Sequence, residues 1–153
     1  MKTIVLYDSV FGNTEKIAQA IGAALPAAAA VVRVTEAGED TLAGVNLLIV
    51  GSPTRAFRPS EGMQNFLKRL PAGGLKGVKV AAFDTRMDVK EVNNKILTVM
   101  VSIFGYAAKP IADGLVKRGG ELILPPEGFI VKGGEGPLKE GELERAGAWA
   151  KKI

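Results

Sequence analysis

The fold is decided near the N-terminus, where residues 2–14 read KTIVLYDSVFGNT. The run from Lys2 to Tyr7 is predicted to be a strand, and its consecutive apolar residues, 4–7, are typical of a strand buried on both faces. From Thr14 onward apolar residues recur at helical spacing, and Pro26 ends that pattern. A buried strand that passes through a short polar loop into a helix predicts a parallel sheet with crossover helices.

The alternation of strand and helix continues along the whole chain. Strands are predicted at 2–7, 31–34, 46–50, 78–83 and 122–131, the last interrupted by Pro125 and Pro126, and helices at 14–25, 60–70, 107–118 and 143–153. We therefore expect an α/β protein, a three-layer doubly wound sheet of five parallel strands in the order 2-1-3-4-5. No linker or internal repeat is visible, so residues 1–153 are predicted to form a single domain.

Composition excludes several kinds of chemistry. The chain has no histidine and no cysteine, which rules out imidazole catalysis, thiol nucleophiles, disulfides and the usual zinc sites. Its 20 Lys and Arg outnumber its 16 Asp and Glu, but an aromatic content of 6% is low for stacking on nucleic-acid bases. An activity of this chain would have to come from carboxylates, amines, hydroxyls or a cofactor, and no nucleic acid is expected as a partner.

Neither a targeting segment nor a membrane span is predicted. The apolar run at the N-terminus covers residues 4–7 before Asp8 interrupts it, too short for a signal-peptide core. The uncharged apolar stretch at 96–108 falls short of the roughly 18 residues that a membrane span requires. We therefore expect a cytoplasmic protein.

The ligand site of such a sheet lies beyond the carboxyl ends of the strands, where the strand order reverses. The loops to examine are those after Tyr7, Val50 and Phe83. In the first loop, residues 8–14, backbone amides at a helix N-terminus and three polar side chains could bind an anion. The loop carries no lysine, so a single phosphate monoester suits it better than a triphosphate. The alternative is that these residues only form a turn and a helix cap.

Several segments resemble the flavodoxin family. Residues 7–14, YDSVFGNT, resemble the flavodoxin phosphate loop, whose pattern is Ser/Thr-x-Thr/Phe-Gly-Asn-Thr. Residues 51–59, GSPTRAFRP, resemble the segment that wraps the flavin ring, and 83–86, FDTR, lie where the family's other ring-binding loop leaves the fourth strand. The runs PEGF at 126–129 and GEGPL at 134–138 also recur in flavodoxin-like domains. The resemblance covers nearly the whole chain.

The resemblance implies a bound FMN that supplies the redox chemistry. The residues expected to hold its phosphate are Ser9, Val10, Phe11, Gly12, Asn13 and Thr14. Those expected on one side of the isoalloxazine ring are Pro53, Thr54, Arg55, Ala56 and Phe57, and those on the other are Asp84, Thr85 and Arg86. The implied partner is a redox protein or a small-molecule electron donor or acceptor.

The chain departs from electron-carrying flavodoxins in two ways. Their rings are usually flanked by a Trp and a Tyr, whereas Trp149 lies in the last predicted helix, where packing is its expected role. Residues 55–95 hold nine basic and four acidic side chains, an excess that includes both predicted ring loops. Arg55, Arg58 and Arg86 are expected to make the flavin potential less negative than in acidic flavodoxins.

Residues 88–106 fit helix and strand periodicity equally well. A helix here could wall an apolar substrate pocket, with Tyr106 near the ring edge, or form a homodimer through 96–106; the alternative is an ordinary core segment. The favoured function is FMN-dependent electron transfer. The runner-up is a small FMN-dependent reductase of a quinone-like or porphyrinogen-related substrate, and a third reading keeps the fold but binds another ligand.

Overall fold

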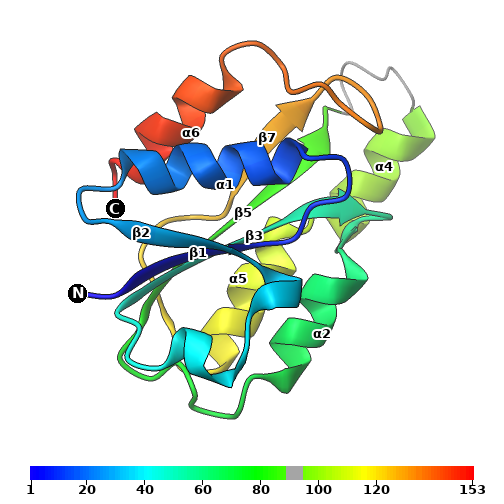
Figure 1. The fold of residues 1–153 in the computed structure, drawn as a ribbon. Helices are drawn as coiled ribbons and strands as arrows, with labels where there is room; N and C mark the ends of the chain where they lie inside the picture. The colour runs from blue at the N-terminus through cyan, green and yellow to red at the C-terminus, as the bar shows by residue number, and fades with distance from the viewer. Residues whose placement is uncertain (89–94) are drawn as a thin grey trace.

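A parallel sheet forms the middle layer of the molecule, seen edge-on in Figure 1, which shows a computed structural model. The structure describes residues 1–88 and 95–153, without the side chains of 97 and 102–104. The strands are β1 (Thr3–Tyr7), β2 (Ala29–Arg33), β3 (Leu47–Arg55), β4 (Arg58–Pro59), β5 (Lys79–Met87), β6 (Glu121–Leu122) and β7 (Glu127–Val131). Their order, β2-β1-β3-β5-β6 with β7 also paired to β5, confirms the predicted 2-1-3-4-5 arrangement.

The fifth position of the sheet is shared by two short strands. β6 pairs with the start of β5 at Lys79 and Val80, and β7 pairs with its end, from Phe83 to Met87. Pro125 and Pro126 lie between β6 and β7, and proline lacks the amide proton that a sheet ladder needs. The predicted interruption of the fifth strand is therefore confirmed.

Helices cover both faces of the sheet. α1 (Asn13–Ala24) and α6 (Glu142–Ala150) lie on one face, and α2 (Glu61–Arg69) and α5 (Ala108–Lys117) lie on the other (Figure 1). Two short 3-10 turns, Val34–Glu36 and Glu39–Leu42, follow β2. Because side chains alternate along a strand, Ile4 and Leu6 of β1 enter the core with α2 and α5, while Val5 enters the core with α1 and α6.

Trp149 has the packing role that its sequence position predicts. It is 5% exposed and lies edge-to-face with Phe83 and Phe129, with ring centroids 6.2 to 6.3 Å apart. This aromatic cluster joins α6 to the centre of the sheet beneath α1.

The structure corrects two predicted element ends. β3 continues to Arg55 and β5 to Met87, so Pro53–Arg55 and Asp84–Arg86, expected in loops, are strand residues. The reason is pairing: β3 stays in register with β5 through Pro53 and Thr85, and β7 covers the other edge of β5. These residues, predicted to lie in loops, are therefore held by the sheet.

Residues 95–104 form a helix, α4 (Lys95–Phe104), which decides the ambiguous periodicity for this part of the interval. The earlier part of the interval, 89–94, lies outside the described residues. α4 stands at the end of the sheet where β1, β3 and β5 finish (Figure 1).

Candidate functional site

A cavity of about 410 Å³ opens at the carboxyl ends of β1, β3 and β5, a volume within the roughly 300–1,000 Å³ range of small-molecule sites. It is lined by twelve of the fourteen residues that the sequence singled out. These are Ser9, Val10, Phe11, Asn13, Thr14, Pro53, Thr54, Arg55, Ala56, Phe57, Thr85 and Arg86. Segments separated by more than 70 positions in the chain thus meet around one space.

The other two predicted residues, Gly12 and Asp84, do not line this cavity. Gly12 caps helix α1 with a φ of 94°, a left-handed conformation that favours glycine. Asp84 is fully buried on β5 beneath the cavity wall. Both positions therefore support the lining from behind it.

The loop that precedes α1 is organised around the Ser9 hydroxyl. Its Oγ accepts hydrogen bonds from the amides of Gly12 at 3.1 Å and Glu15 at 3.4 Å. Amides of the first helical turn have no carbonyl partner within the helix, and the helix dipole makes this end partly positive. The loop therefore converges its amides on an oxygen acceptor, as a phosphate site requires.

Two further contacts connect this loop to neighbouring segments. Asn13 donates from its side-chain nitrogen to the carbonyl of Glu135 at 3.0 Å. The hydroxyls of Thr14 and Thr85 lie 2.8 Å apart, and both side chains are buried. Since one hydrogen bond uses one hydroxyl proton, the pair keeps a second proton with which to donate to a ligand.

The second wall is a tight hairpin between β3 and β4. Arg55 faces Arg58 across it, and the connecting residues Ala56 and Phe57 have φ values of 48° and 68°. Two left-handed residues in a two-residue loop are typical of the hairpin turn that matches strand twist. The Arg55 guanidinium lies 5.7 Å from the ring centroid of Phe11, so the hairpin lies against the first loop.

The third wall contains an ion pair between the buried Asp84 and the partly exposed Arg86. Arg86 Nε and Nη2 donate to the two carboxylate oxygens of Asp84, each at 2.7 Å, and the amide of Ala108 donates to Oδ2 at 2.9 Å. Burial raises the pKa of the Asp84 carboxyl, and the bonds from Arg86 and Ala108 oppose that rise. The Arg86 guanidinium lies 3.7 Å from the ring centroid of Tyr106, which lines the cavity as expected.

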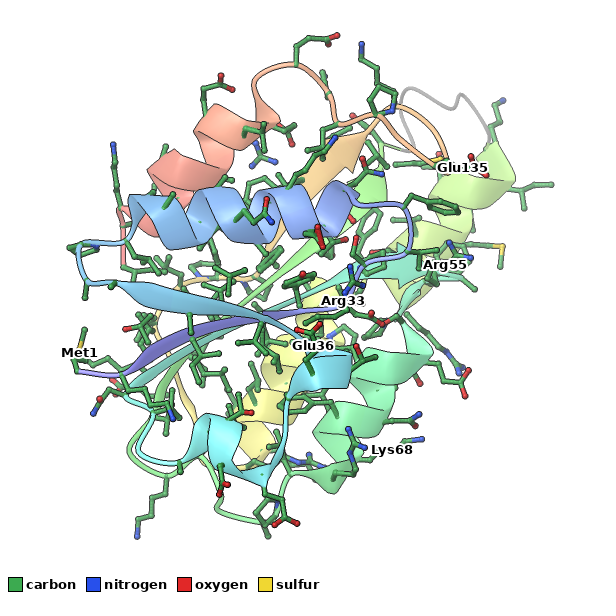
Figure 2. The ribbon with its side chains drawn as sticks, in the orientation of Figure 1. Met1, Arg33, Glu36, Arg55, Lys68 and Glu135 are labelled. Atoms are coloured by element: carbon green, nitrogen blue, oxygen red, sulfur yellow. The ribbon has the colours of Figure 1, made fainter. Side chains whose placement is uncertain are left out.

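Of the basic side chains that the structure describes in residues 55–95, only Arg55 and Arg86 line the cavity. Lys79 begins β5, at the end of the strand away from Arg86, and Lys68 lies in the last turn of α2, well away from Arg55 in Figure 2. Arg86 is neutralised by Asp84, and Arg58 does not line the cavity. Among the cavity-lining arginines of the described chain, Arg55 is exposed and has no carboxylate partner within salt-bridge distance.

The sequence did not single out four of the lining residues individually: Met87, Val101, Val131 and Gly134. Met87 and Val131 are the last residues of β5 and β7. A prediction that extended the fourth strand to Met87 would have placed that residue at the edge of the sheet where the cavity opens. Val101 belongs to α4, in line with the expectation that a helix here walls a pocket. The homodimer contact through 96–106 stays a prediction. The exposed apolar side chains of Ile96 (73%) and Val99 (55%) are compatible with it.

The described residues lack two features that would indicate other kinds of site. Residues 1–88 and 95–153 hold no group of three side chains suited to binding a metal ion. In the same part of the chain, no helix has the length and apolar character needed to cross a membrane.

Comparison with known proteins identifies the family. The family model for the flavodoxin domain matches residues 4–115. The chain therefore belongs to the flavodoxin domain family. Comparison with curated proteins found no match.

Solved structures with the same fold span the whole chain. A flavodoxin from the domain Archaea is 22% identical with a TM-score of 0.77, and covers 98% of this chain and 94% of its own. Flavodoxin 1 from Bacillus cereus is 16% identical with a TM-score of 0.76, covering 99% and 96%. A flavodoxin, WrbA-like protein from Agrobacterium tumefaciens is 17% identical with a TM-score of 0.72, covering 99% and 94%. These structures support the α/β fold of the flavodoxins for this chain.

Proposed function

We propose that the chain binds FMN non-covalently in this cavity and transfers electrons between redox partners. The observation that carries the proposal is the meeting of three segments at one cavity. A loop of converging amides lies at one end, and two walls that include Phe57 and Tyr106 lie beside it. A phosphate monoester attached to a planar aromatic ring system matches this arrangement: its anionic group suits the loop, and its flat ring suits the space between the walls.

The donor set suits the phosphate of FMN. The loop supplies amides at a helix N-terminus and the hydroxyls of Ser9 and Thr14, and it contains no lysine for a triphosphate. The carboxylates of Asp8 and Glu15 are paired with Arg33, which reduces their repulsion of an anion. The residues present therefore fit the group.

Bound FMN would supply the electron-transfer chemistry that a chain without histidine or cysteine lacks. The protein's own residues bind and orient it. The loop of 9–14 holds one end, the left-handed turn at Ala56 and Phe57 places the hairpin wall, and the Asp84–Arg86 pair holds the third wall rigid. Val101 and Tyr106 cover the cavity from the side of α4 and limit the access of water.

Titration with FMN tests the proposal. Purified protein is mixed with FMN and followed by its visible spectrum and by flavin fluorescence, with micromolar or tighter binding expected. Gly12→Ala is the informative variant because its Cβ meets no atom within 4 Å, so the change only strains a residue at φ +94°. Gly44→Ala is a matched control, since Gly44 has φ +71°, equally open space and a position away from the cavity.

Both variants should lose about 1 kcal/mol of folding stability, the usual cost of a left-handed alanine. Gly12→Ala should also weaken FMN binding about tenfold, because a loss of about 1.4 kcal/mol in phosphate contacts corresponds to that factor. Gly44→Ala should leave FMN binding unchanged. Absence of FMN binding by the unaltered protein would reject the proposal and favour a different ligand for the loop.

The second candidate, a small FMN-dependent reductase of a quinone-like or porphyrinogen-related substrate, is favoured by one observation. Val101 of α4 and the neighbouring Tyr106 extend the cavity wall with apolar and aromatic surface, which suits an apolar substrate beside the flavin. Anaerobic mixing of the FMN-loaded protein with NADH or NADPH separates the candidates. Rapid bleaching without a second protein supports an enzyme, and no bleaching supports a carrier. The cytoplasmic location and the identity of the redox partner stay predictions.

A further inference from the structure

Arg33 lies outside the predicted site, yet it contacts the phosphate-type loop, residues 8–14, from behind. It is the last residue of β2, and its side chain points toward the loop that enters α1 (Figure 2). Nη1 donates to the carbonyl oxygen of Ser9 at 2.9 Å, and Nη2 donates to Glu15 Oε2 at 2.9 Å. The same guanidinium lies 3.9 Å from Asp8 Oδ1. One planar group thus touches the start, the middle and the helical end of the loop.

The contact with Ser9 determines where the loop amides point. Ser9 is held at its carbonyl by Arg33, while its Oγ accepts from the amides of Gly12 and Glu15. Its own amide donates to Asp8 Oδ1 at 2.9 Å, which fixes the other side of the residue. Releasing the carbonyl would let Ser9 rotate and would loosen the convergence of the two amides.

Arg33 also offsets two negative charges beside the loop. Asp8 and Glu15 are 15% and 34% exposed, and both would repel a phosphate dianion. The Tyr7 hydroxyl donates to Glu15 Oε2 at 2.9 Å. Burial, together with Glu15, raises the pKa of Tyr7, so the hydroxyl keeps the proton that it donates. Its ring lies 5.2 Å from the Arg33 guanidinium. Arg33 is therefore fixed by four neighbours, Tyr7, Asp8, Ser9 and Glu15, and cannot easily turn toward solvent.

We infer that Arg33 is a positioning residue for the phosphate-type loop, and that it makes the site discriminate a phosphorylated flavin from one without phosphate. The inference rests on the proposed function for its ligand. It depends on the fork geometry of arginine, because a lysine ammonium is a point charge that cannot hold the Ser9 carbonyl and the Glu15 carboxylate in the same plane.

Three variants test the inference: Arg33→Gln, Arg33→Lys and, as a control for the loss of one positive charge, Lys68→Gln on α2. The dissociation constants of FMN and of riboflavin are measured separately, since riboflavin has the ring but no phosphate. Arg33→Gln should lower the preference for FMN about tenfold or more, the factor expected when a hydrogen bond to a charged group is lost. The dissociation constant of riboflavin should change by less than about twofold in Arg33→Gln.

On a logarithmic scale, Arg33→Lys should keep less than half of the preference for FMN over riboflavin that Arg33→Gln loses. Lys68→Gln should keep the whole preference. Full recovery by lysine would show that charge alone is responsible and would overturn the positioning role. An unchanged preference in Arg33→Gln would overturn the inference altogether.

Amide hydrogen exchange in the protein without flavin provides a readout that does not depend on FMN. Exchange at Gly12 and Glu15 should be faster in Arg33→Lys than in the unaltered protein, and unchanged in Lys68→Gln. If the unaltered protein binds no FMN, the proposed function fails, while the exchange rates still decide whether Arg33 organises the loop. Unaltered rates in both Arg33 variants would reject that role.

Discussion

Glu142 carries the prediction that the structure defines most sharply. It is the first residue of α6 and is 6% exposed. Its Oε2 accepts from the amide of Ile130 at 2.6 Å and from Arg145 Nη2 at 2.8 Å, and its Oε1 accepts from Arg145 Nε at 2.9 Å. The carboxylate thus ties α6 to β7, the strand whose last residue, Val131, walls the cavity.

The change to test is Glu142→Gln, which keeps the size of the side chain and removes its charge. A hydrogen bond to a charged group contributes about 1.5 to 3 kcal/mol. The Arg145 side chain is 40% exposed, so its ion pair adds at most about 1 kcal/mol after solvent screening. We expect a loss of about 2 kcal/mol at pH 7, which for a chain of this size lowers Tm by about 4 to 8 °C.

Glu144→Gln is the matched control. Glu144 is exposed in the same first helical turn and meets the same helix dipole, worth about 0.3 to 1 kcal/mol. The difference between the two variants therefore isolates the contacts that Glu142 makes with Ile130 and Arg145.

The difference should also depend on pH. Burial raises the pKa of Glu142, but the bonds from Arg145 and from the Ile130 amide outweigh it and hold that pKa below its ordinary value. The stabilisation is therefore complete above the unfolded pKa of about 4.3 and is lost as the pH falls through the lower folded value. Urea unfolding from pH 7 to pH 3, followed by the fluorescence of the single tryptophan, Trp149, measures it. The reasoning is refuted if Glu142→Gln costs no more than Glu144→Gln, or if its cost does not shrink at acid pH.

Three further predictions follow from the walls of the cavity and the sheet beneath it. Arg55→Gln should make the redox potential of bound FMN more negative by tens of millivolts, since about 1.4 kcal/mol corresponds to about 59 mV in a one-electron step. Arg58 does not line the cavity, so Arg58→Gln should shift the potential less, and redox titration of the two variants compares the shifts. Gly51→Ala should cost about 3 kcal/mol or more in urea unfolding, because its Cβ would lie 2.0 Å from the Phe83 ring, and adding Phe83→Leu should recover part of the loss. Ala56→Asn should raise Tm by about 2 °C, since asparagine tolerates the φ of 48° better than alanine, and a lower Tm would contradict the strain argument.

Much of the fold follows from local patterns. The consecutive apolar residues of β1 and β3 require burial on both faces, and this requirement alone indicates a sheet between two helical layers. The loop YDSVFGNT could be placed at the end of a strand because strand and helix periodicities meet there. The rule that ligands bind where the strand order reverses indicated the loops after Val50 and Phe83, and the resemblance to flavodoxins then assigned Thr54 and Thr85, which line the cavity.

The ends of the strands could not be predicted in the same way. Pro53–Arg55 and Asp84–Arg86 have loop-like composition, and they are strand residues because other strands pair with them. Pro53 pairs with β5, Thr54 and Arg55 pair with β4, and Asp84–Arg86 pair with β7. The helix α4 could not be predicted for a similar reason, since the apolar periodicity over 96–103 fits a helix and a strand equally well. Propensity is a local property, whereas pairing depends on residues far away in the chain.

The sequence by itself determined the layers, the strand order and the segments that would meet at the carboxyl ends of the strands, because burial periodicity and connection handedness are encoded locally. Only the tertiary structure decided which charges act at that edge. In it Arg86 pairs with Asp84, Lys68 and Lys79 lie away from the cavity, and Arg33 donates to the carbonyl oxygen of Ser9. The physical reason is that electrostatic effects depend on distance and burial in space, and a list of charged residues along the chain contains neither.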